Sequence, residues 1–168
     1  YLLGRGVTIF LLLNLYLYFE EGIDFYKNYK KIGWSGLAGG TGLGIAMISF
    51  IWSITNTSAA VTLLCLAAMP FMTAFLGFLF LNEKISLNVW VAIIIATIGI
   101  FIIAYGNISS GTLFGLIFGL ASALGFSVFS VSLRWRKDTP KFTTVAIAGL
   151  FCAIISTVIL VETDTSLI

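Results

Sequence analysis

Histidine is absent from the sequence, and the two cysteines, Cys65 and Cys152, lie far apart in apolar segments. Zinc, haem and iron–sulfur sites need several closely spaced His or Cys ligands, so the sequence predicts no metal site and no cofactor. A glycine-rich phosphate loop and a paired nucleophile and base, which an enzyme of the common classes would need, are also missing. We therefore do not expect an enzyme.

Charge is scarce as well. Charged residues make up 10% of the chain against 60% hydrophobic residues, and the mean hydropathy is +1.09. This composition lies far outside that of soluble domains and predicts a membrane protein whose main partner is the lipid bilayer. The net charge is only +2, which gives no basic surface for nucleic acid, so no nucleic acid is expected as a partner.

Six apolar segments of roughly 20 residues, the length that crosses a bilayer, follow one another along the chain. They are apolar on consecutive residues, whereas the strands of a membrane barrel alternate. The sequence therefore predicts an all-α, polytopic helical membrane protein. The six predicted spans are residues 1–19, 33–55, 58–81, 87–105, 111–133 and 142–161. Because the chain begins at Tyr1, inside the first span, we expect it to be a fragment.

Lysine and arginine gather in alternate loops. The loops 20–32, 82–86 and 134–141 are basic, whereas 56–57 and 107–110 carry no charge. Short basic loops favour the cytoplasmic side, so we expect these three loops to be cytoplasmic. We expect the membrane itself to be a bacterial inner membrane. The basic residues of these loops are Lys27, Lys30, Lys31, Lys84, Arg134, Arg136, Lys137 and Lys141.

Two polar residues of the first span need an explanation. Arg5 lies roughly 22 Å from Glu20 along a helix, within the outer half of the hydrocarbon. A charge at that depth costs at least a few kcal/mol unless it faces a cavity, a partner or the interface, so Arg5 either extends to the outer headgroups or has a functional role. Asn14 should bond a neighbouring helix or line a wet cavity, because its own helix cannot fully satisfy its amide.

Small residues recur every four positions in the second and fifth spans. Such stripes let helix backbones approach closely in lipid. We interpret them as packing inside the bundle, and a contact between copies in a homo-oligomer is the alternative. The two series are Gly36, Gly40 and Gly44, and Gly111, Gly115, Gly119 and Ala123.

Several short motifs follow one another in the order seen in EamA-type repeats of drug/metabolite transporters. They are Thr57-Ser58-Ala59-Ala60, Ala68-Met69-Pro70-Phe71-Met72-Thr73-Ala74, Leu81-Asn82-Glu83-Lys84-Ile85-Ser86, and then Trp90 and Gly99. The chain resembles this family most clearly over residues 1 to 105. Arg5 is similar to the arginine that opens the second helix of the family, and the segment from Gly111 looks like the start of a second repeat.

The resemblance implies a fold of ten helices in two inverted repeats of five. Residues 1–106 would then be the first repeat without its first helix, and 107–168 the truncated start of the second. It also implies a secondary transporter that exports or exchanges a small metabolite or drug-like solute by alternating access. The alternative function is a membrane scaffold or receptor, or an intramembrane enzyme.

Pro70 should interrupt the third span, and interrupted membrane helices are tolerated where they line a cavity or pack against neighbours. A simple bend is the alternative. The candidate substrate contacts are Arg5 for an anionic group, Trp52 for an aromatic wall, Thr62 and Ser122 for hydrogen bonds, together with Asn14 and Pro70. No span contains a carboxylate well inside it, so facilitated exchange is as compatible with the sequence as proton antiport.

Overall fold

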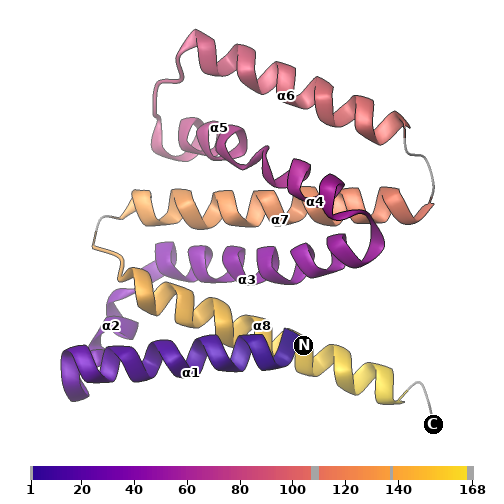
Figure 1. Cartoon of the computed structure of the whole chain (residues 1–168). Helices are drawn as coiled ribbons and strands as arrows, with labels where there is room; N and C mark the ends of the chain where they lie inside the picture. Colours follow the sequence, from indigo (N-terminus) through magenta and orange to yellow (C-terminus); the bar gives the residue numbers. More distant parts are fainter. Residues whose placement is uncertain (1, 107–109, 137, 166–168) are drawn as a thin grey trace. The chain divides into compact units, whose positions relative to one another are not determined.

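All regular structure in the described part of the chain is helical (Figure 1). The computed structural model describes the backbone of residues 2–106, 110–136 and 138–165, so Lys137 and most of the predicted neutral loop 107–110 lie outside the described residues. The elements are α1 (Leu2–Glu21), the 3-10 helix η1 (Gly22–Phe25), α2 (Tyr26–Lys31), α3 (Gly33–Asn56), α4 (Ala59–Leu66), α5 (Met69–Leu81), α6 (Leu87–Gly106), α7 (Ser110–Trp135) and α8 (Lys141–Thr165).

Five stretches of these helices are long and apolar enough to cross a membrane. They are Leu2–Glu20, Gly33–Asn56, Ala59–Leu81, Leu113–Trp135 and Lys141–Leu160. A shorter apolar stretch, Leu87–Gly99, forms the first part of α6. Each of the six predicted spans falls on one of these stretches, which confirms a polytopic helical membrane protein.

Contacts divide the chain into two compact units. Unit 1 comprises Tyr1–Gly44 and Ser132–Ile168, and unit 2 comprises Ile45–Val131. Each unit draws on both of the repeats expected from the sequence. This division therefore does not bear on the expected repeat boundary near residue 106.

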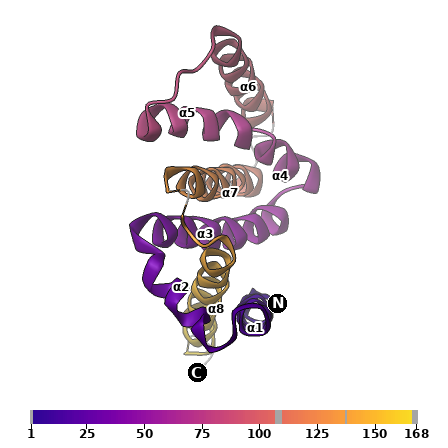
Figure 2. The ribbon, with the colours of Figure 1, turned by 90° about the vertical axis from the view of Figure 1, so that its left-hand side faces the viewer.

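In unit 1, α1 and α8 lie side by side (Figures 1 and 2). A methyl group added at Gly6 would lie 2.7 Å from the backbone nitrogen of Ala153 and 2.8 Å from the carbonyl oxygen of Gly149. One added at Gly149 would lie 3.0 Å from the carbonyl oxygen of Gly6. The two backbones therefore touch where neither residue has a side chain, which maximises packing in lipid.

The glycine stripe of α3 also packs inside unit 1. A methyl group at Gly40 would lie 2.7 Å from Cγ2 of Ile147, and one at Gly44 would lie 2.9 Å from Cδ1 of Phe151. Both neighbours belong to α8. The stripe therefore serves the packing of the bundle, as interpreted from its spacing.

In unit 2 the stripe of α7 has the same use. A methyl group at Gly115 would lie 2.5 Å from Cβ of Thr57, and one at Gly119 would lie 2.9 Å from Cβ of Cys65. Small residues thus bring α7 against the α3–α4 connection and against α4 itself.

The third predicted span is two helices rather than one. Leu66 ends α4, and α5 begins at Met69 with Pro70 in its first turn. Proline lacks an N–H and clashes with the carbonyl four residues earlier, whereas the first turn of a helix needs no such N–H. The expected interruption is therefore present, and it lies at residues 67 and 68, just before Pro70. The Ala67 N–H, in the break itself, bonds the Leu63 carbonyl of α4 at 3.0 Å.

The polar stop after α5 is a left-handed cap. Asn82 has φ 52°, a conformation that asparagine tolerates better than most residues, and its N–H bonds the carbonyl of Gly77. The chain then turns into α6, and the Trp90 ring packs edge-on against Phe75 and Phe78, with centroids 6.4 and 6.0 Å away. These ring contacts hold the α5–α6 hairpin together near its loop.

The α1–α8 contact makes a stability prediction. We expect Gly6→Ala to lower the free energy of unfolding by about 1–3 kcal/mol, because backbone atoms of α8 cannot yield to the added methyl group. Gly4 is the matched control on the same helix, since nothing lies within 4 Å of a methyl group there. Gly4→Ala should be neutral or stabilising by up to about 1 kcal/mol through helix propensity. Unfolding of the purified protein in detergent measures both, and equal effects of the two variants would contradict the packing.

Candidate functional site

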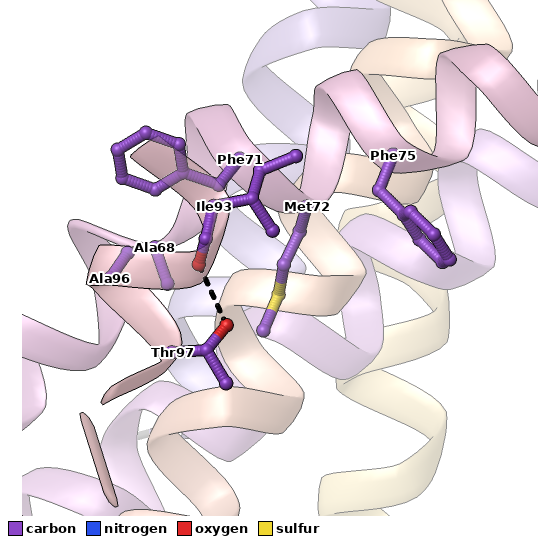
Figure 3. Close-up of a pocket in the computed structure, with 7 residues that line it drawn as sticks. All are labelled: Ala68, Phe71, Met72, Phe75, Ile93, Ala96 and Thr97. Carbon is purple, nitrogen blue, oxygen red and sulfur yellow. Dashed lines mark hydrogen bonds between the residues drawn. The ribbon is translucent and has the colours of Figure 1, made fainter. Parts of the chain in front are cut away.

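A cavity of about 230 Å³ lies between α5 and α6 in unit 2 (Figure 3). Its lining is almost wholly apolar and consists of Ala68, Phe71, Met72 and Phe75 on the α5 side and Ile93, Ala96 and Thr97 on α6. The residues recur at the three- and four-residue spacing of a single helix face on each side. The cavity begins at the break between α4 and α5 and ends where Phe75 meets Trp90.

Thr97 carries the one side-chain polar group of this lining, and it is already bonded. Its hydroxyl donates to the carbonyl oxygen of Ile93 at 2.8 Å (Figure 3). The lining therefore suits an apolar or aromatic group better than a charged one. Sites for drug-sized ligands usually measure about 300–1,000 Å³, so this cavity fits a smaller solute or one part of a larger one.

Two hydroxyl groups lie near the break. The Ser127 hydroxyl of α7 donates to the Ala123 carbonyl at 2.8 Å and lies 3.1 Å from the Met69 carbonyl, at the first residue of α5. The Thr73 hydroxyl, one turn after Met69, is buried and has no hydrogen-bond partner among the described residues. Buried hydroxyls are nearly always bonded, so Thr73 is a group with unused bonding capacity beside the break.

The structure places Thr62 and Ser122 in contacts between helices. Both side chains are fully buried. The Thr62 hydroxyl lies 2.9 Å from that of Ser53, which donates to the Gly115 carbonyl at 2.7 Å. Ser122 donates to the Ala46 carbonyl at 3.0 Å. These bonds fasten α3, α4 and α7 together, and a role of either residue in binding substrate stays a prediction.

Trp52 and Pro70 are exposed residues of unit 2. The Trp52 ring is 39% exposed and packs against Phe118, with centroids 5.4 Å apart. Pro70 is exposed and directly precedes Phe71 of the cavity lining. None of the six predicted contacts lines the cavity itself, and Pro70 comes nearest to it in the chain.

Arg5 and Asn14 belong to unit 1. Arg5 is a half-buried residue of α1. The Asn14 amide donates to its own helix at the Phe10 carbonyl, 2.7 Å away, and its Oδ1 accepts from the Tyr29 hydroxyl of α2 at 2.7 Å. The expected bond from Asn14 to a neighbouring helix is therefore present.

The residues of the cavity lining were not predicted as a site. Their signal in the sequence was the small residue Ala96 on α6, together with Phe71 and Phe75, which follow Pro70. Pattern alone cannot separate such a face from one buried against another helix. The structure resolves this because it shows a cavity between the two helix faces.

Five apolar stretches of the described helices, one of them broken beside a cavity, define a polytopic helical membrane protein. The chain belongs to the EamA-like transporter family, whose profile matches residues 2–105. It is 28% identical over 150 residues to a protein of Helicobacter pylori (strain J99 / ATCC 700824) described as an uncharacterized transporter. The match covers 88% of this chain and 49% of that protein, so the chain spans about half the length of this relative. No solved structure matches the chain significantly.

The Asn14–Tyr29 bond makes a second prediction. Burial raises the pKa of Tyr29 above its ordinary value of 10.0. A raised folded-state pKa means that the neutral hydroxyl stabilises the fold below pH 10 and that this contribution is lost as the pH rises through the folded-state pKa. We expect Tyr29→Phe to cost about 1 kcal/mol at pH 8 and less above pH 10. Unfolding measured at both pH values tests this.

Tyr26→Phe is the control, since Tyr26 is an exposed residue of the same short helix. It should leave stability at pH 8 unchanged. A Tyr29→Phe protein as stable as the wild type at pH 8 would show that the hydrogen bond to Asn14 contributes nothing.

Proposed function

We propose that the full-length protein is a secondary transporter that exports or exchanges a small metabolite or drug-like solute by alternating access. Membership of the EamA-like family and the transporter description of the Helicobacter pylori relative support this function. The observation that carries the proposal furthest is the break between α4 and α5 beside the α5–α6 cavity. Broken helices at the level of the bilayer recur in carriers, where they form binding sites.

The cavity between α5 and α6 is the part of the path that receives an apolar or aromatic portion of the solute. Its lining offers surface but no unused hydrogen bond. The Thr73 hydroxyl near the break, which has no partner among the described residues, can gain one when α5 moves. Arg5, Asn14, Trp52, Thr62, Pro70 and Ser122 remain proposed contacts for the polar portion.

The orientation in the membrane is part of the same proposal. We assign the basic segments 20–32, 82–86 and 134–141 to the cytoplasmic side of a bacterial inner membrane. Residues 1–106 and 107–168 are proposed as parts of two EamA-type repeats, and a family match that ends at residue 105 supports this boundary. No metal-ligand cluster occurs within the described residues, and we propose a carrier rather than an enzyme.

Filling the cavity tests its role. We expect Ala96→Phe to slow solute uptake at least tenfold, because the new ring takes the space that the solute needs. Ala92→Phe, one turn away on α6 and outside the lining, should leave uptake within about twofold of the wild type. Proteoliposomes with full-length protein and a panel of radiolabelled metabolites give the rates. If both variants transport equally, the cavity is not on the path; if no solute moves with the wild type, the transporter proposal fails.

Arg5 is tested separately by charge. If Arg5 attracts an anionic group of the solute, Arg5→Ala should raise KM for an anionic substrate about tenfold or more while Arg5→Lys retains most of the affinity. An Arg5 that only extends to the outer headgroups would show unchanged KM in Arg5→Ala.

The same vesicles with and without an imposed pH gradient distinguish proton antiport from facilitated exchange, since only antiport responds to the gradient.

A further inference from the structure

Basic residues from two segments, 20–32 and 134–141, lie at one end of unit 1. The guanidinium of Arg136, in the α7–α8 connection, lies against Gly33, where a methyl group would be 2.6 Å from its Nη1. Two residues before Gly33, α2 ends with Lys30 and Lys31. The buried hydroxyls of Ser35 and Thr139 hold the two segments together at 2.9 Å.

The side chains of this basic surface point outward. It is defined by Lys27, Lys30, Lys31, Arg134, Arg136 and Lys141, all of them exposed. In the sequence, segments 20–32 and 134–141 hold seven basic and four acidic residues, an excess of three, while the whole chain has a net charge of +2. The entire positive excess of the protein thus lies in these two segments.

Two tryptophans flank the basic surface. Trp34 is the second residue of α3 and is 85% exposed, and Trp135 is the last residue of α7 and is 56% exposed. Tryptophan at the ends of membrane helices lies at the level of the lipid headgroups, with its ring against the acyl chains. The basic surface therefore lies at headgroup depth.

From this arrangement we propose that the basic surface of unit 1 binds the headgroup of an anionic phospholipid, such as phosphatidylglycerol. Basic residues directly beside membrane helices attract anionic lipids. The net positive charge of the two segments favours a lipid headgroup whose phosphate is not balanced by a positively charged amine. The flanking tryptophans favour a lipid over a soluble anion, because they offer contact for its acyl chains. This binding does not depend on the transport proposal.

Titration of the detergent-solubilised protein with phosphatidylglycerol or phosphatidylcholine, read by native mass spectrometry, tests the proposal. We expect the wild type to bind phosphatidylglycerol at least tenfold more tightly than phosphatidylcholine. Each basic residue removed should weaken binding of phosphatidylglycerol about fivefold. The combined Lys30→Gln, Lys31→Gln and Arg136→Gln variant should therefore lose the preference, with phosphatidylcholine binding unchanged.

Two controls separate charge from other effects. Lys84→Gln removes a basic residue from the α5–α6 loop of unit 2 and should keep the preference. A variant with Lys30→Arg, Lys31→Arg and Arg136→Lys preserves every charge and should keep it as well. Salt should reduce the preference, because ~1 M salt shortens the screening length to ~3 Å.

Equal affinity of the wild type for the two lipids would overturn the proposal. So would a triple glutamine variant that keeps the preference, or a Lys84→Gln protein that loses it to the same extent. Glycerol 1-phosphate serves as a soluble headgroup probe. If it binds as tightly as phosphatidylglycerol, the surface is a site for a soluble anion and the lipid assignment is wrong.

Discussion

A bilayer offers no water to an unpaired backbone group, and each such group costs several kcal/mol. This constraint governs the most unusual element of the chain, the span that breaks at residues 67 and 68. Proline at residue 70 removes one donor, and the helix responds by ending at Leu66 and starting again at Met69. The turn between them bonds its own N–H groups back to α4, and a serine of α7 reaches the first carbonyl of α5. The break is therefore tolerated because backbone bonds of the turn satisfy carbonyl groups at the end of α4 and N–H groups at the start of α5.

Close packing of the helices is the second source of the stability of the fold. Lipid tails are as apolar as leucine, so helices in a membrane gain little from the hydrophobic effect and must associate through contact and hydrogen bonds. Glycines on α1, α3, α7 and α8 bring backbones together, and the serines at 53 and 122 then reach carbonyl oxygens on other helices. The two devices depend on each other, because a short hydroxyl side chain reaches a neighbouring carbonyl only when the helices are close.

The sequence was sufficient to predict the helical class, the five stretches that are long enough to cross a membrane together with a sixth, shorter apolar one, and the use of the glycine stripes inside the bundle. Hydropathy and four-residue spacing report these features directly. It was also sufficient to predict a bonded Asn14, though not its partner Tyr29, which lies in a short helix that periodicity cannot identify. It was sufficient to predict an interruption at Pro70 but not to decide between a bend and a true break, because proline is compatible both with a bend and with the first turn of a new helix. The cavity was not predicted, because an apolar helix face looks the same in the sequence whether it is covered or open.

The Ser127 hydroxyl has one hydrogen and two carbonyl oxygens within reach, one in its own helix and one at the start of α5. A rotation about the Cβ–Oγ bond of Ser127 turns its O–H group from one carbonyl oxygen to the other. The serine donates one hydrogen bond in both orientations. The fastening between α7 and α5 can thus be released and restored with almost no net enthalpy. The hydrogen bond from Ser127 to α5 is directional and specific, yet breaking it adds little to the activation barrier for moving α5. The stability of the packed helices and the rate at which α5 moves can therefore vary independently.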